Sequence, residues 1–108
     1  MSEIKNIMGL LGRLFGGKSG KQDEIIDMIS RGGVIIDVRS AAEFAGGNVP
    51  GSKNIPLNTI GAKASNIKKL NKPIIVCCAS GMRSSQAASI LKSKGVEVIN
   101  GGSWNSLT

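Results

Sequence analysis

The stretch Lys72-Pro-Ile-Ile-Val-Cys-Cys-Ala-Ser-Gly-Met-Arg-Ser-Ser-Gln-Ala-Ala-Ser-Ile-Leu-Lys-Ser-Lys94 decides the fold of this chain. Its beginning, Lys72–Cys77, is an apolar and largely β-branched run with the length of a buried strand. From Met82 to Lys94 apolar residues recur at helical spacing, and Gly95 follows, which predicts a helix that ends at a glycine. The stretch therefore predicts a strand, a tight loop and a helix in direct succession.

The sequence on both sides of this stretch continues the alternation of strands and helices. Val34–Val38 and Val96–Ile99 are short β-branched runs that predict two further strands. Ser40 and Glu43 have the spacing of a capping box, which predicts the start of a short helix. The remaining predicted elements are helices over Asp23–Ser30 and Thr59–Lys69 and a loop over Gly46–Pro56. This alternation predicts an α/β domain, with a central parallel sheet and helices on both faces.

The length and composition of the chain limit its chemistry. Its 108 residues are enough for one domain with one modest core, and 41% hydrophobic against 19% charged residues is typical of globular proteins. The chain has no histidine, which excludes every metal site or catalytic triad that needs an imidazole. Its two cysteines, Cys77 and Cys78, are too few for a cysteine-only zinc site. We therefore expect no metal and no organic cofactor.

The positive charge of the chain, +7 in total, is unevenly distributed. Such a region attracts a small oxyanion, an anionic lipid or a nucleic acid, although lysines scattered over helices for solubility are an alternative interpretation. The chain has three aromatic residues, fewer than surfaces that stack nucleic acid bases use, so we expect no nucleic acid partner. Between Phe44 and Val96 there is no acidic residue, and the basic ones are Lys53, Lys63, Lys68, Lys69, Lys72, Arg83, Lys92 and Lys94.

The first residues of the chain predict a separate element. Apolar side chains at three- and four-residue steps indicate an amphipathic helix over residues 1–17, residues 18–21 form a predicted linker, and residues 22–108 form the main domain. The helix could pack on the main domain, attach to a membrane surface or contact a partner, and the sequence leaves these alternatives open. No stretch has the length of a membrane span or the order of a signal peptide, so we expect a cytoplasmic protein with free thiols.

The loop that follows the predicted strand has the features of an anion-binding site. Functional groups in parallel sheets lie beyond the carboxyl ends of the strands, where Cys78 is expected. Successive loop amides, the helix N-terminus and Arg83 would all favour a thiolate and lower the pKa of the Cys78 thiol. The alternative is a buried structural cysteine, which is the interpretation we favour for Cys77. The predicted loop residues are Ala79, Ser80, Gly81, Met82 and Arg83.

Four segments resemble the single-domain rhodanese (thiosulfate sulfurtransferase) family in order and spacing. The resemblance implies a rhodanese-like three-layer fold and a cysteine that takes a sulfane sulfur from an anionic donor such as thiosulfate. The sulfur is held as a persulfide and passed to cyanide or to a thiol, such as one on a protein. Cys78 then corresponds to the nucleophile, and the amides of Ala79 to Arg83 to the cradle. The segments are Ile35–Arg39, Glu43–Pro56, Cys78–Ser84 and Asn100–Trp104.

The same resemblance suggests roles for residues outside the loop. Asp37 and Arg39 match a pair of the family at a strand end, and we interpret them mainly as groups that brace loops, with Arg39 near the substrate entrance. We interpret Glu43 as a helix cap rather than a catalytic acid. Trp104 is interpreted as a core or rim aromatic residue rather than a binding surface.

Two departures from the family and two alternative functions accompany this hypothesis. Ala79 stands where the family often has a basic residue, which weakens the case for thiosulfate as the natural donor. Asn48 stands where the family often has a histidine, which leaves the reaction class unchanged and the natural substrate open. Counted from Cys77, the run to Arg83 has the spacing of a phosphatase or arsenate reductase loop. The other alternative is a catalytically quiet interaction module, although such modules normally lack the nucleophile that Cys78 provides.

Overall fold

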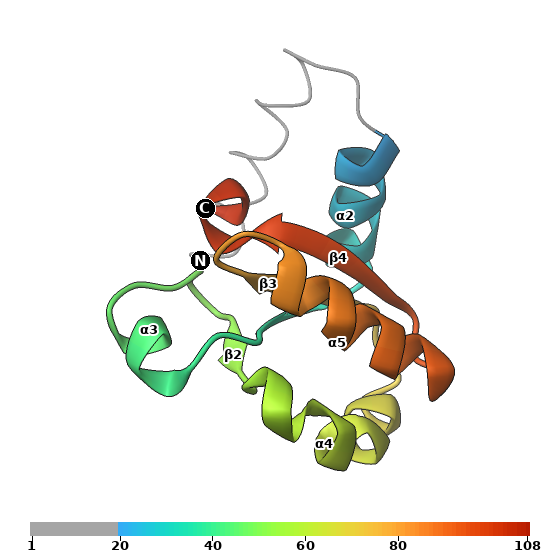
Figure 1. The fold of residues 1–108 in the computed structure, drawn as a ribbon. Helices are drawn as coiled ribbons and strands as arrows, with labels where there is room; N and C mark the ends of the chain where they lie inside the picture. Colours follow the sequence, from blue (N-terminus) through green and yellow to red (C-terminus); the bar gives the residue numbers. More distant parts are fainter. Residues whose placement is uncertain (1–19) are drawn as a thin grey trace.

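The computed structural model describes residues 20–108 and shows a single four-stranded sheet with helices around it (Figure 1). All neighbouring strands pair in parallel, in the order β2-β1-β3-β4. The predicted α/β class with a parallel sheet is therefore confirmed. The strands are β1 (Val34–Asp37), β2 (Lys53–Asn54), β3 (Ile74–Cys78) and β4 (Val98–Ser103), and the helices are α2 (Gly20–Ser30), α3 (Ala41–Ala45), α4 (Leu57–Lys69), α5 (Met82–Ser93) and the 3-10 helix η1 (Trp104–Leu107).

The predicted N-terminal helix, residues 1–17, lies outside the described residues, as do residues 18 and 19 of the predicted linker. Gly20 and Lys21, predicted as the end of that linker, instead form the first turn of α2. Asp23 in this turn suits the positive end of the helix dipole. Within residues 20–108 no helix is long and apolar enough to cross a membrane.

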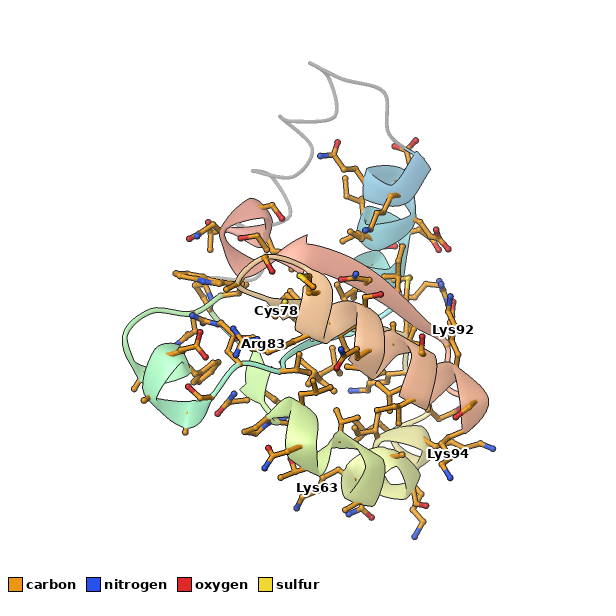
Figure 2. The ribbon with its side chains drawn as sticks, in the orientation of Figure 1. Lys63, Cys78, Arg83, Lys92 and Lys94 are labelled. Atoms are coloured by element: carbon orange, nitrogen blue, oxygen red, sulfur yellow. The ribbon has the colours of Figure 1, made fainter. Side chains whose placement is uncertain are left out.

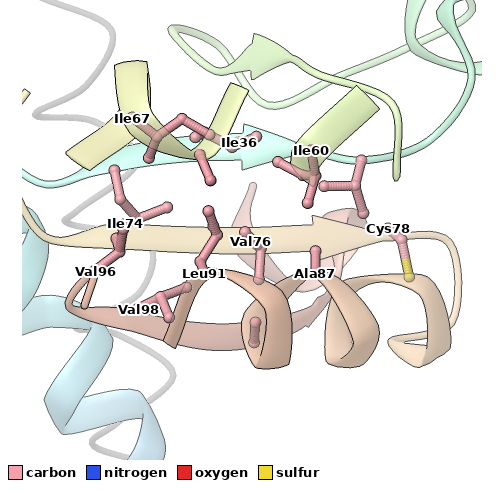
Figure 3. Packing of buried hydrophobic residues seen from close by; sticks show 13 residues of the cluster. Ile36, Ile60, Ile67, Ile74, Val76, Cys78, Ala87, Leu91, Val96 and Val98 are labelled. Carbon is pink, nitrogen blue, oxygen red and sulfur yellow. The ribbon is translucent and has the colours of Figure 1, made fainter. Parts of the chain in front are cut away.

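Helices cover both faces of the sheet, so the core has two parts. The helices α4 and α5 pack on one face, and α2 and η1 on the other (Figure 1). Every residue of β3 is buried because this central strand is covered on both sides. Figure 3 shows the first part of the core, which includes Ile36, Ile60, Ile67, Val76 and Leu91. The second part consists of Ile25, Met28, Val49, Ile75, Cys77 and Leu107.

The strands β1 and β3 differ from the prediction by one or two residues at their ends, and β2 and β4 differ more. The predicted loop Gly46–Pro56 contains β2, a two-residue edge strand of polar residues without the alternation that would reveal it. The third predicted strand, Val96–Ile99, instead begins at Val98 and runs through two glycines to Ser103. The register of β4 shifts between the partners of Val76 and Cys78, so the two glycines lie opposite a single residue of β3. A Cβ atom on Gly101 would lie 2.9 Å from the Ile75 side chain, so the packing there requires a glycine.

The order of the strands places the carboxyl ends of β1 and β3 side by side. From β1 the chain proceeds to β2 on one side, and from β3 it proceeds to β4 on the other. The loops that follow β1 and β3 therefore leave the sheet in opposite directions. Ligands of open α/β sheets bind where the strand order reverses in this way. Arg39 and Cys78 lie at this position.

Candidate active site

Cys78 is the last residue of β3, and its side chain lies on the sheet face that α5 covers. The chain turns over Ala79 and Ser80, which are exposed, and α5 begins at Met82. Gly81 is the N-cap residue of α5 and has a left-handed backbone with φ of 99°. Glycine adopts this conformation without the steric cost that a Cβ atom would add. The sulfur therefore lies at the N-terminus of a twelve-residue helix.

Three hydrogen-bonding groups surround the Cys78 sulfur. The Gly81 amide donates to Sγ at 3.0 Å and the Ser84 amide at 3.4 Å. The Ser84 hydroxyl oxygen is also 3.4 Å from Sγ. The sequence predicts a cradle of amides from Ala79 to Arg83. Of these, the Gly81 amide donates to Sγ at 3.0 Å and the Ser80 amide also helps to lower the pKa of Cys78, while Ser84 lies one residue beyond the predicted range.

These contacts act on the charge of the thiol. Burial alone would raise the pKa of Cys78, but hydrogen bonds with Ser84 and with the loop amides more than offset burial and lower it. At Cys77 burial dominates, and together with the nearby Asp37 carboxylate it raises the pKa of that thiol to about 12. Of the two cysteines, only Cys78 is in surroundings that favour a thiolate.

The Arg83 guanidinium is bound to Glu43. Its Nη1 and Nη2 atoms donate to the two Glu43 carboxylate oxygens at 2.8 and 3.0 Å. The arginine, together with the Ser40 amide and hydroxyl, lowers the pKa of Glu43 to about 2. The sequence predicts Arg83 as one of several groups that favour the Cys78 thiolate, and among these the largest contributions come from hydrogen bonds. Arg83 acts on the sulfur only through space.

Glu43 has a structural role in addition to this ion pair. Ser40 and Glu43 form the predicted capping box at the start of α3, which is confirmed. The Ser40 side chain accepts a hydrogen bond from the Glu43 amide, and the Glu43 carboxylate accepts one from the Ser40 amide. Helix α3 is thereby tied through Arg83 to the first turn of α5.

Asp37 and Arg39 form a buried ion pair at the end of β1. Asp37 is fully buried, and Arg39 Nη2 lies 2.7 Å from Asp37 Oδ2. Arg39 also donates to the carbonyl oxygens of Glu43 and Gly47 at 3.3 and 2.7 Å, and its guanidinium lies 4.6 Å from the centre of the Trp104 ring. The pair thus braces the loop after β1, as the sequence predicts. Trp104 contributes to the rim and to the second part of the core.

Three of the basic residues, Lys63, Lys92 and Lys94, lie away from Cys78. Figure 2 shows Cys78 and Arg83 at one end of α5, and Lys92 and Lys94 at its other end. Lys63 projects from α4. The basic side chain nearest the sulfur in sequence is therefore Arg83, whose charge is balanced by Glu43. Within residues 20–108, no group of three histidine, cysteine, aspartate or glutamate residues could hold a metal ion.

Sequence reasoning missed two residues that contact the loop. Ser84 contributes both its amide and its hydroxyl group. Asn100 in β4 accepts a hydrogen bond from the Ser84 hydroxyl at 2.6 Å and donates one to the Gly81 carbonyl at 3.1 Å. One feature of the sequence could have indicated Asn100, because it is a polar residue directly before two glycines at the end of a predicted strand. Its partners became apparent only in the folded chain.

The chain is similar to known proteins along most of its length. Residues 21–105 match the family model described as "Rhodanese-like domain". The chain is 37% identical over 67 residues to the Bacillus subtilis protein YqhL, covering 61% of this chain and 52% of that protein. It is 38% identical over 64 residues to the thiosulfate sulfurtransferase GlpE of Pseudoalteromonas translucida, covering 59% and 60% of the two chains. The chain thus spans little more than half the length of these relatives.

Solved structures agree with this family match. A structure described as a rhodanese with anions from E. coli has a TM-score of 0.62 and 32% sequence identity to this chain. The superposition covers 68% of this chain and 89% of that one. The similarity thus includes the fold of about two thirds of this chain.

Proposed function

This chain belongs to the rhodanese-like domain family, and we propose that it is a sulfurtransferase with Cys78 as its nucleophile. One observation carries the proposal: the Cys78 sulfur accepts hydrogen bonds from the Gly81 and Ser84 amides at the N-terminus of α5. Such a site favours a thiolate over a thiol and suits a negatively charged sulfur attached to it. The sulfurtransferase names of several relatives support the same reaction class.

In the first step the Cys78 thiolate attacks the outer sulfur of an anionic donor. With thiosulfate, a new sulfur–sulfur bond forms at Sγ, and the bond between the two donor sulfurs breaks. Sulfite leaves with the electron pair of that bond. The product is the Cys78 persulfide, whose negative charge lies on the added sulfur. The loop amides of residues 79–84 are the proposed donors to this charge.

In the second step an acceptor removes the added sulfur. Cyanide or a thiolate attacks the outer sulfur of the persulfide, and the bond to Sγ breaks. The electron pair returns to Cys78, which becomes a thiolate again, and the product is thiocyanate or an acceptor persulfide. The cycle balances without a metal or an organic cofactor, and it needs no general base once Cys78 is ionised.

The surroundings of Cys78 suggest which ligands it takes. Ala79, Ser80 and Met82 carry no charge, and the Arg83 guanidinium is paired with Glu43. A small anion thus depends on backbone amides rather than on free cationic side chains, which supports a donor or acceptor thiol on a larger molecule as well as thiosulfate. Asp37 and Arg39 support the site by holding its neighbouring loop. The persulfide cycle requires a free thiol, so we assign the protein to the reducing cytoplasm.

The geometry disfavours the phosphatase alternative. A phosphatase loop counted from Cys77 needs that thiol to be ionised and aimed at the loop. The Cys77 side chain instead packs in the second part of the core, with a pKa raised to about 12 by burial and the Asp37 carboxylate.

The test is the intact mass of the protein after treatment with thiosulfate in the absence of reductant. Wild type and Cys77→Ser should gain one sulfur atom, which cyanide then removes. Cys78→Ser should gain none. A sulfur gained by Cys78→Ser would overturn the assignment, and the absence of a gain in all three proteins would favour an interaction module or a different donor.

A further inference from the structure

The carboxamide of Asn100 contacts three separate groups around the candidate site. Its Nδ2 atom donates to the Gly81 carbonyl at 3.1 Å. Its Oδ1 atom accepts from the Ser84 hydroxyl at 2.6 Å and from the Gly102 amide at 2.9 Å. All hydrogen-bonding groups of this side chain except one amide hydrogen are used. Asn100 is therefore firmly held between β4 and the loop before α5.

The backbone partners fix the orientation of this carboxamide. The Gly102 amide can only donate, so it requires the oxygen of Asn100, and the Gly81 carbonyl can only accept, so it requires the nitrogen. The Ser84 hydroxyl then has to donate its one hydrogen to Asn100 Oδ1. Asn100 thereby fixes Ser84 beside the sulfur, with the Ser84 oxygen 3.4 Å from Cys78 Sγ and the Ser84 amide donating to it.

The register of β4 brings Asn100 to this position. Asn100 pairs with Val76 on β3, and Ser103 pairs with Cys78, so two glycines of β4 lie opposite Cys77 alone. Because side chains alternate along a strand, Asn100 shares the face of Val76 and Cys78, which α5 covers. The regular pairing of Asn100 with Val76 therefore places this β4 side chain beside the first turn of α5, and the register shift follows Asn100.

Asn100 touches two residues whose amides donate to the sulfur. Gly81 donates its amide to Sγ and accepts from Asn100 with its carbonyl. Ser84 donates its amide to Sγ and its hydroxyl to Asn100. We propose that Asn100 is a positioning residue, which holds the Gly81 and Ser84 amides on the Cys78 sulfur and thereby stabilises its thiolate and persulfide. The persulfide part of this proposal rests on the function proposed above.

The test compares two replacements of Asn100 that separate its contacts. Asn100→Ala removes all three hydrogen bonds. The hydroxyl of Asn100→Ser can still accept from the Gly102 amide, as serine does in turns, but it is too short to hold Gly81 and Ser84. Asn66→Ala, an exposed position on α4, is the matched control. All variants are made in the Cys77→Ser background, so that only one thiol titrates.

The primary measurement is the fraction of Cys78 thiolate against pH, followed by ultraviolet absorbance. We expect Asn100→Ala and Asn100→Ser to need a higher pH for ionisation, with about tenfold less thiolate at a given pH below the midpoint. Asn66→Ala should superimpose on its parent. The persulfide formed with thiosulfate should also be lost faster from both Asn100 variants. Thermal unfolding of each protein shows that the comparison is made between folded molecules.

Two outcomes would overturn the proposal. A folded Asn100→Ser protein with an unchanged titration would mean that Asn100 only shapes the turn at Gly102. An equal shift in Asn66→Ala would mean that the effect is not specific to Asn100. Because the titration needs no sulfur donor, it separates this proposal from the proposed function. A shifted titration without persulfide in any protein would leave the positioning role standing while the sulfurtransferase assignment fails.

Discussion

The side chains of Cys77 and Cys78, neighbours in the sequence, pack on opposite faces of β3. The alternation of side chains along a strand produces this separation. Cys77 packs in the core part covered by α2 and η1, whereas Cys78 meets the N-terminus of α5. One residue type therefore has two environments, and the pKa values of the two thiols shift in opposite directions. This relationship leads to the first prediction.

At neutral pH we expect a small alkylating reagent to modify Cys78 far faster than Cys77. Burial opposes ionisation at both residues, but hydrogen bonds lower the pKa of Cys78 below its ordinary value of 9.0, while that of Cys77 is raised to about 12. Since the thiolate is the reactive form, the rate for Cys77→Ser should reach half its maximum below pH 9.0. Cys78→Ser should stay slow until strongly alkaline pH. Equal rates for the two variants at neutral pH would contradict this prediction.

Gly81→Ala should impair the site more than the fold. A side chain at φ of 99° is strained and should cost about 1 kcal/mol of stability, which a urea unfolding curve measures. The same strain should turn the amide that donates to Cys78 Sγ and slow persulfide formation at least severalfold. Gly61→Ala is the control, because Gly61 lies within α4 with open space at its Cβ position and alanine favours helices. Unchanged persulfide formation in Gly81→Ala would show that this amide is dispensable.

Arg39→Lys should destabilise the domain by about 2 kcal/mol, as measured by urea unfolding. Lysine keeps the charge but cannot reproduce the planar contacts with Asp37, with the two loop carbonyls and with the Trp104 ring. Asp37 is fully buried, so a poorly matched partner leaves part of its charge uncompensated. Arg31→Lys, at an exposed ion pair, should change stability much less. Similar losses for the two variants would contradict a bracing role for Arg39.

The ion pair of Glu43 and Arg83 should stabilise the fold only above acidic pH. The Arg83 guanidinium and the Ser40 cap lower the pKa of Glu43 from 4.5 to about 2, so the stability it contributes is complete above 4.5 and is lost as pH falls toward 2. Glutamine can serve in the capping box without the charge. We therefore expect Glu43→Gln to unfold at a lower temperature than wild type near neutral pH, with the difference vanishing near pH 2.

The control for that comparison is Glu24→Gln, which removes one negative charge from the exposed surface of α2. It should not show the same acid-dependent difference from wild type. A Glu43→Gln difference that persists unchanged through acidic pH would mean that the glutamate acts by shape or packing and not through its charge.

The sequence alone was sufficient for the class of the fold and for the candidate nucleophile. The apolar run before Cys78 allowed only a buried strand, and the helical pattern after Arg83 required a helix to follow at once. The spacing of Ser40 and Glu43 predicted a cap, because both partners of a capping box lie within one turn. In each case the pattern is local, so the physical cause is contained in a few neighbouring residues.

What the sequence could not supply are contacts between distant segments. Arg83 carries a full charge next to the candidate site, yet its partner is Glu43, forty positions away. Asn100 lies in an ordinary strand pattern, and only the pairing of β4 with β3 in the folded chain places its side chain next to Gly81 and Ser84. Local pattern thus determined which residue can be the nucleophile. The tertiary structure decided which groups hold its charge, because a hydrogen bond or an ion pair depends on distance in space and not on separation along the chain.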